Sequence, residues 1–332
     1  MNRRYRFHRQ AGVGLVEIMV AVTLSLILTA GLVHVYTGNK QTYRIQEALS
    51  RVQENGRFAL DFITRDLRSA GFLGCAGTST KTINTLNNAS GFNWNFGQII
   101  QGDPNPTTAE LVSPSVSPLP GPDVLTIRRS LGNPVQVQAH GGTTGSAPIT
   151  VAPGHGLQPA DVVMVTDCTD AAIFQITNDP SLANSVEHTG GGSTPGNASD
   201  ALGKGYTTAG AIVKLTTSTY YIGTGVSGRP ALFRKDGAAT AQELVEGVED
   251  MQVLYGIDTN GDRTPNRYVT ANNVADWGDV VSAEVRLLLQ TLDNNLASQP
   301  QQYTFNGVTA VSLDRRLRKT FTNTISIRNR TL

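Results

Sequence analysis

One feature restricts the fold of this chain more than any other: an apolar segment close to the N-terminus. Residues 13–33 are apolar or small, apart from Glu17 and a few hydroxyl side chains. A helix of about 21 residues is about 31 Å long, which matches the hydrocarbon core of a bilayer. We therefore expect residues 13–33 to form a helix that can cross a membrane, and the rest of the chain to fold outside it.

The flanks of this segment predict its orientation. No comparable basic cluster closely follows the segment, whereas one precedes it: Arg3, Arg4, Arg6, His8 and Arg9. The positive-inside rule then predicts a cytoplasmic N-terminus and an exported body. A secretory signal cut near Ala30 and a plain membrane anchor are two alternatives, but neither explains Glu17 or the Gly12-Val13 junction.

Glu17 is costly in an apolar helix. A carboxylate at the centre of a membrane span costs about 2.5 to 3.5 kcal/mol, and less near the end of the span. Its position fits a resemblance to the prepilin signal of type IV pilins and type II secretion pseudopilins. In this register Gly12 ends a 1–12 leader, Val13 is the first mature residue in place of the usual Phe, and Glu17 is the fifth.

The resemblance implies processing and assembly roles for these residues. Prepilin peptidase would cut after Gly12, and the new amino terminus at Val13 would be methylated. When the subunit is drawn from the inner membrane into the helical bundle of the pilus, Glu17 would pair with the amino terminus of a neighbouring subunit, which compensates its charge. The alternative is an interfacial Glu17 that is tolerated because it lies close to the membrane surface.

The helical pattern continues beyond the apolar run, through residues 34–70. Apolar or small residues recur at steps of three, four or seven: Ile45, Leu49, Val52, Gly56, Ala59, Ile63 and Ala70, with Phe58, Phe62 and Leu67 beside them. The opposite face alternates in charge at Glu54, Arg57, Asp61 and Arg65. Gly71 is a natural C-terminal stop. A helix over 13–70 is about 87 Å long, with its second half packed on a globular domain.

The remaining residues, 71–332, read as a loop-rich β domain. Runs bounded by Gly, Pro, Asn or Asp predict strands over 124–128, 135–138, 149–151, 162–166, 172–177, 211–221, 231–234, 251–257, 280–290 and 320–327. Residues 242–248 have a short helix as an alternative. Flexible loops are expected at about 102–122 and 182–205. The predicted fold class is α+β, with a long N-terminal helix on an antiparallel sheet.

The chain has two cysteines, Cys75 and Cys168, without the spacing of a metal site. An exported body favours one disulfide between them, and two separate buried thiols are the alternative. A second resemblance, to PilW-type minor pilins, supports the pairing. It rests on 55–58, 62–63 and 66–75 at the end of the helix, and on 161–168 and 172–174 around the second cysteine.

The PilW resemblance implies a non-catalytic subunit of the type IV pilus machinery. Its partners would be other minor pilins and the major pilin, which it would join in an inner-membrane, periplasm-facing complex that primes assembly, and it would reach the pilus tip at the cell surface. A minor pseudopilin of type II secretion is one alternative. A pilus-displayed adhesin or ligand-binding module, using the loops 102–122 and 182–205, is another.

One segment has the oxygen spacing of a calcium loop: Asp258, Asn260, Asp262 and Thr264. Arg263 stands where an EF-hand needs Gly, and Val269 where it needs Glu. The alternative is a polar hairpin turn that needs no ion. Calcium is therefore the only cofactor that the sequence suggests, and the two readings stay open.

The sequence gives little support to catalysis or nucleic-acid binding. The five histidines are scattered, and His155 lies in a Gly- and Pro-rich turn where a structural role is expected. No nucleophile elbow, P-loop or zinc-protease motif is present. A formal net charge of +1 gives no electrostatic attraction to nucleic acid. The basic run at 314–319 is expected to be a solvated face.

Overall fold

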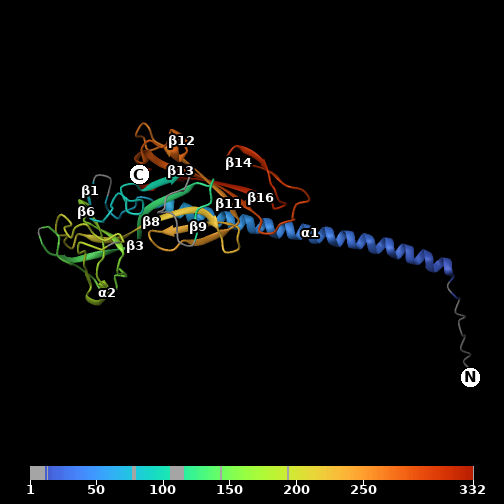
Figure 1. Cartoon of the computed structure of the whole chain (residues 1–332), viewed down its shortest axis with the longest axis horizontal. Coiled ribbons are helices and arrows are strands. Elements are labelled where there is room, and N and C mark those ends of the chain that lie inside the picture. Colours follow the sequence, from blue (N-terminus) through green and yellow to red (C-terminus); the bar gives the residue numbers. More distant parts are fainter. Residues whose placement is uncertain are drawn as a thin grey trace, which may run out of the picture. The chain divides into compact units, whose positions relative to one another are not determined.

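The chain separates into an N-terminal unit and a larger head. In the computed structural model, residues 12, 14–76, 80–104, 116–142, 144–192 and 194–331 are described. The N-terminal unit is Met1–Arg51, and the head is Val52–Leu332. Helix α1 (Leu15–Arg68) starts in the first unit and ends in the second, where a largely antiparallel β structure follows it (Figure 1). The predicted α+β fold class is confirmed.

Helix α1 begins and ends within two residues of the predicted bounds. The carbonyl of Gly14 accepts a hydrogen bond from the N–H of Glu17 at 3.0 Å, which closes the first turn. Gly71 follows the last turn with φ +69°, and its N–H donates to the carbonyl of Arg128 at 2.9 Å. A Cβ at Gly71 would lie 2.7 Å from Ile99 Cδ1. Glycine is needed here for its positive φ and for the close approach.

The larger sheet of the head has ten strands. Its main path runs β1-β6-β5-β8-β3-β4-β7, with β2 beside β3, β9 beside β8 and β10 beside β9. Within the described strands, β1 and β6 pair in parallel and the other pairs are antiparallel. The bounds are β1 (Lys81–Asn84), β2 (Ile100–Asp103), β3 (Val124–His140), β4 (Ile149–Val151), β5 (Val162–Thr166), β6 (Asp170–Gln175), β7 (Ser185–Val186), β8 (Ala211–Thr224), β9 (Pro230–Asp236) and β10 (Gln242–Glu246), with the short helix α2 (Pro180–Ala183) before β7.

A smaller antiparallel sheet has the order β12-β11-β13-β16. A separate hairpin, β14–β15, lies between β13 and β16 in the chain. The bounds are β11 (Val248–Ile257), β12 (Arg267–Val269), β13 (Val280–Gln290), β14 (Gln302–Phe305), β15 (Val308–Val311) and β16 (Arg318–Ser326), with two 3-10 turns, η1 (Ala271–Asn273) and η2 (Trp277–Asp279), and a final short helix α3 (Arg328–Thr331).

The main core of the head lies where α1 meets both sheets. The predicted apolar stripe is buried at Val52, Ala59, Ile63, Leu67 and Ala70. These residues share one hydrophobic cluster with side chains of both sheets, including Leu125, Tyr220, Met251, Val285 and Ile325. Phe58, which the sequence places beside the stripe, is instead 52% exposed. It precedes Arg65 by seven residues, so the two share the charged face of the helix.

Buried polar contacts fix the last turns of α1 on the larger sheet. Asp66 is 3% exposed. One of its carboxylate oxygens accepts a hydrogen bond from Arg129 Nη2 at 2.7 Å, and the other accepts one from the hydroxyl of Tyr220 at 2.7 Å. A charge pair out of contact with water depends on both partners. This pair therefore sets the register of α1 on β3 and β8.

The smaller sheet approaches α1 through β16. Asn323 Nδ2 donates to Thr64 Oγ1 at 3.0 Å. A Cβ at Gly56 would lie 2.5 Å from the ring of Phe321, so the aromatic ring reaches the helix backbone only because position 56 is glycine. Gly56 belongs to the stripe that the sequence predicts, and it acts there by the absence of a side chain.

The predicted strands are present, but those at 124–128 and 135–138 are parts of one strand, β3, with a register shift between Leu131 and Val135. Several expectations for the intervening segments also need correction. Residues 242–246 form a strand, β10, and not the alternative helix, because they pair with β9. Residues 182–205, expected as a flexible loop, include β7 and the buried Asn197, whose side chain exchanges hydrogen bonds with the backbone of Gln175 at 2.7 and 2.8 Å. Within the expected loop 102–122, residues 105–115 lie outside the described residues.

The basic run at 314–319 is only in part the solvated face that the sequence predicts, because Arg315 and Lys319 are exposed but Arg316 and Arg318 are not. The Arg318 side chain is 6% exposed and pairs with Glu249 and with Asp314, each at 2.7 Å. Arg316 also pairs with Asp314, at 2.9 Å. Burial alone would lower the pKa of Arg318, but these two carboxylates raise it above its ordinary value. Arg316 and Arg318 thus form an ion-pair network with Asp314 and Glu249 at the start of β16.

Candidate functional site

The N-terminal unit carries the residues that the prepilin resemblance singles out. Gly12 is exposed, Val13 lies outside the described residues, and Glu17 is exposed in the first turn of α1. Within the part of the chain that the structure describes, no side chain or ion pairs with the Glu17 carboxylate. The helix thus presents a lone carboxylate among apolar side chains.

Among the described residues, none packs on the apolar half of α1. Leu24 is 56% exposed and Leu28 is 72% exposed. Among the described residues, α1 is the one helix that is long and apolar enough to cross a membrane. Its hydroxyl groups are satisfied within the helix, because Thr23, Ser25 and Thr29 each donate to the carbonyl four residues earlier. These features suit a membrane anchor.

The head carries a disulfide between Cys75 and Cys168, as the sequence predicts. The sulfur atoms are 2.13 Å apart, and the cysteines are separated by 93 positions. Cys75 follows α1, and Cys168 lies in the turn between β5 and β6 with φ +72°. Its N–H donates to Thr166 Oγ1 at 3.1 Å, which supports the turn. The bond therefore ties the exit of α1 to the larger sheet.

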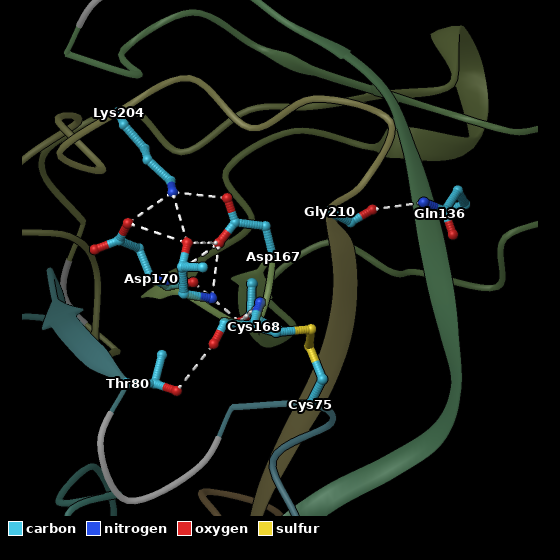
Figure 2. The surroundings of a disulfide bond; sticks show 10 residues. Cys75, Thr80, Gln136, Asp167, Cys168, Asp170, Lys204 and Gly210 are labelled. Atoms are coloured by element: carbon cyan, nitrogen blue, oxygen red, sulfur yellow. Dashed lines mark hydrogen bonds and ion pairs between the residues drawn. A yellow bond between two sulfur atoms is a disulfide. The ribbon is translucent and has the colours of Figure 1, made fainter.

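A charged cluster holds the turn around Cys168 (Figure 2). Lys204 Nζ lies 2.6 Å from Asp167 and 2.7 Å from Asp170. Asp167 Oδ1 also accepts hydrogen bonds from the N–H groups of Thr169 and Asp170. Burial alone would raise the pKa of Asp167, but Lys204 and these donors lower it below its ordinary value. The cluster is a structural clamp on the turn.

The disulfide leads to a first prediction. Cys75→Ser should lower the free energy of unfolding by about 2 to 5 kcal/mol, because the open chain recovers the entropy of a long closed loop. Urea unfolding of the full-length protein in detergent measures the change. The Cys75→Ser/Cys168→Ser double variant is the control and should match the single variant. Alkylation of both thiols in the folded wild type without reductant would contradict the bridge.

The segment proposed for calcium forms a closed polar turn. Asp258 Oδ1 accepts hydrogen bonds from the N–H groups of Asn260 (3.1 Å) and Gly261 (2.7 Å), and its Oδ2 accepts one from Arg263 N (2.7 Å). Asp262 Oδ1 accepts one from Thr264 N at 2.8 Å. In the described ranges, no group of three or more His, Cys, Asp or Glu side chains is arranged to hold a metal. The turn is complete without a cation.

Calcium binding at this turn remains a proposal. A second prediction distinguishes a turn that binds Ca²⁺ from one that is held only by its own hydrogen bonds. Asp258→Ala should lower the melting temperature of metal-stripped protein, because three N–H groups lose their acceptor. Differential scanning calorimetry measures this effect. Titration of Ca²⁺ into metal-stripped wild type tests the ion: binding heat that Asp258→Ala abolishes would support it, and no heat would end the proposal.

Two of the histidines that look scattered in the sequence meet in the head. The rings of His140 and His188 lie 5.7 Å apart in an edge-to-face arrangement. His140 Nδ1 accepts a hydrogen bond from Tyr206 N at 3.1 Å, and His188 Nε2 lies 3.0 Å from the carbonyl of Ala147. Burial lowers the pKa of both rings, and the charge of His188 lowers that of His140 further. Both shifts favour the neutral form of the rings.

The pair makes the head acid-sensitive, which is a third prediction. A folded-state pKa below the unfolded value of about 6.5 means that the unfolded chain binds more protons at acid pH. The contribution of the pair to the free energy of unfolding is therefore complete above pH 6.5 and is lost as pH falls below that value. Asp123 has the opposite effect on the pH dependence of stability. Burial raises its pKa to about 6, so its protonation favours the folded head as pH falls.

The effect of the histidine pair is isolated by comparing how much the melting temperature falls on acidification in the wild type and in His188→Gln. Melting temperatures of both proteins at pH 7.5 and pH 5 measure it, and the wild type should lose more on acidification. An equal loss in the two proteins would remove the pair as the cause. His155→Gln is the matched control. His155 Nδ1 accepts a hydrogen bond from Leu157 N at 3.0 Å, which is consistent with the expected structural role.

Two parts of the chain match known protein families. Residues 7–33 match the prokaryotic N-terminal methylation motif, and residues 219–329 match the Type IV Pilus-assembly protein W family, PilW. Together they support a PilW-type minor pilin. The PilW match extends from the end of β8 through β16 and so includes the whole smaller sheet. No curated protein and no solved structure matches the chain.

The two matches connect the chain to type IV pilus assembly as a pilin-like protein. Both families are structural pilin or assembly families and not enzyme families. The family expectation is confirmed, although the residues that carried the resemblance at 55–75 and 161–174 lie outside the matched PilW range. The family match that supports the PilW-type assignment therefore lies in a different part of the head from the residues whose resemblance first indicated it. The methylation motif implies membrane anchoring and interaction with other pilus components.

Proposed function

We propose that this PilW-type protein primes type IV pilus assembly in an inner-membrane complex with other minor pilins, and that it enters the pilus near the tip. The observation that carries the proposal is the lone carboxylate of Glu17 in an exposed apolar helix, within the methylation motif at 7–33. A chain that functions alone has no use for this carboxylate in a membrane span. A subunit that packs with others of its kind does.

The proposal includes a path for the chain. Prepilin peptidase cleaves between Gly12 and Val13 on the cytoplasmic side, and the new amino terminus is methylated. The head faces the periplasm, and α1 leaves the bilayer when the subunit joins the pilus. In the assembled state, Glu17 accepts a hydrogen bond from the amino terminus of a neighbouring pilin, and the two charges compensate each other.

Two measurements test the proposal. Mass spectrometry of the mature protein should find Val13 at the amino terminus, and any other terminus contradicts the processing step. Deletion of the gene should remove surface pili while the major pilin remains in the inner membrane. Normal pili with lost attachment would point to an adhesin instead. Normal pili with a secretion defect would point to a pseudopilin.

A further inference from the structure

The outer edge of β16 is the longest regular sheet edge in the described head. β16 ends the smaller sheet and pairs with β13 along its nine residues without a register shift. The other terminal strands are shorter: β1 has four residues, β2 has four, β7 has two, β12 has three, and β10 has five with a bulge. Proteins usually blunt a long edge with a proline, a bulge or a covering element. Residues 318–326 contain no proline.

The ends of β16 show which backbone groups point away from β13. The N–H and C=O of Arg318 bond to the side chain of Gln301, at 2.6 and 3.2 Å. Beyond the strand, the N–H of Ile327 donates back to the carbonyl of Val281 at 2.9 Å. Backbone direction alternates along a strand, so the even-numbered residues point outward. Within the described chain no hydrogen-bond partner reaches the backbone groups of Thr320, Thr322, Thr324 and Ser326.

This edge is accessible as well as unpaired. The side chains of the same even-numbered residues are exposed, whereas Phe321, Asn323 and Ile325 turn toward α1 and the core. Figure 1 shows β16 beside α1. The strand is thus supported by α1 on one face and by Gln301 and Tyr303 at Arg318, where β14 contacts it, and within the described chain its outward backbone groups are unpaired from Thr320 to Ser326. Threonine also favours the extended backbone that a neighbouring strand requires.

Cations without a carboxylate partner among the described residues lie near the edge, and one of them, Lys319, has its Nζ 5.7 Å from the centroid of the Phe321 ring. Arg57, Thr64 and Arg68 recur at steps of seven and four on α1, so they form one stripe, and Thr64 contacts β16. Lys319 is exposed on β16 itself. In the described part of the chain, no carboxylate pairs with Arg57, Arg68 or Lys319. A segment bound here would meet positive charge on the side of the sheet that faces α1.

We propose that the outer edge of β16 receives an extended segment of another polypeptide that bears acidic side chains, and that this segment adds a strand to the smaller sheet. Only an extended backbone offers donors and acceptors at the two-residue repeat of the edge, and acidic side chains complement Arg57, Arg68 and Lys319. A second copy of this chain fits poorly, because it would bring the same cations to the contact. The inference goes beyond priming and does not depend on it.

Hydrogen exchange tests the pairing directly. The full-length protein is measured alone in detergent and again in the complex purified from membranes through an affinity tag, with single-residue resolution over 318–327. In the complex, the amides of Thr320, Thr322, Thr324 and Ser326 should exchange about 100-fold more slowly, while the amides bonded to β13 change little. Unchanged exchange at the even-numbered residues in the complex overturns the proposal. Protection that rises with the concentration of the purified protein alone identifies a second copy, and also overturns it.

Matched variants locate the contact. Thr322→Pro removes one outward N–H and leaves the bonds to β13 in place, whereas Thr322→Ala keeps the backbone. The proline variant should lose the protection, and the alanine variant should keep it. Arg57→Glu/Arg68→Glu should also lose it without a change in melting temperature, which keeps the test valid if the proline variant misfolds. Arg267→Glu, exposed on β12, is the charge control. If the charge-reversed variant keeps the protection of these amides, the proposal that the bound segment is acidic is wrong.

Discussion

Glu17→Gln should leave the protein processed and membrane-inserted but reduce its incorporation into pili by about 100-fold or more. In the proposed assembly the carboxylate compensates a buried amino terminus of a neighbouring subunit. Removing one partner of a buried ion pair costs about 3 to 5 kcal/mol, and each 1.4 kcal/mol is about tenfold in an equilibrium constant. The quantity to measure is the ratio of this protein in sheared pili to that in membranes, by quantitative immunoblot.

The controls for Glu17→Gln separate assembly from processing and insertion. Mass spectrometry of the variant should still find Val13 as the first residue. Ser25→Ala, in the same span, changes a hydroxyl that bonds within its own helix, so it should leave incorporation close to wild type. Incorporation of Glu17→Gln at the wild-type ratio would mean that the carboxylate is tolerated at the membrane surface and not used for pairing.

Asp66→Ala should lower the free energy of unfolding of the head by about 3 to 5 kcal/mol, because it leaves a buried arginine without its partner. The Arg129 side chain is 13% exposed, so water does not replace the lost carboxylate. The Tyr220 hydroxyl loses its acceptor at 2.7 Å in the same substitution and keeps the carbonyl of Phe62 at 3.3 Å. Urea unfolding of the full-length protein, followed by tryptophan fluorescence, measures the change.

The same helix offers a matched control for this prediction. Asp61 pairs with Arg65 at 3.3 Å, but the two side chains are 63% and 74% exposed. Exposed pairs of this kind contribute about 0 to 1 kcal/mol, so Asp61→Ala should have a small effect. Similar losses for the two variants would show that Asp66 contributes through helix propensity and not through its buried partners.

Patterns that repeat along the chain are the ones that the sequence predicts well. The stripe that includes Val52, Ala59 and Ile63 repeats with the helical period, so the burial of one face of α1 can be predicted from the sequence. Gly71 marks the end of that pattern. The strands that the sequence identifies are those with several β-branched residues between turn signals. The four-residue strand β1 carries too little pattern of this kind, and pairing with β6 decides it.

The polar contacts of the head could not be predicted in the same way, because they join residues that are distant in the chain. Asp66 reads as one more charge near the end of an amphipathic helix, and only its contact with Tyr220, 154 positions later, makes it a buried anchor. His140 and His188 meet because β3 and the segment after β7 both border one small core. The Asp258 segment shows the opposite case, since its ligand-like spacing also suits a turn closed by its own backbone.

The bridge between Cys75 and Cys168 changes how the protein can respond to tension. A pilus under load pulls on its subunits, and a pull that enters through α1 reaches Cys75 soon after the helix ends. The covalent link then passes the force directly to the turn before β6, so the 93 intervening positions cannot be drawn out. At about 3.4 Å per extended residue, about 300 Å of chain is withheld from unravelling. The strands β1 to β5 are thereby shielded from unravelling, and a pull that has reached Cys75 acts next on the chain that follows Cys168.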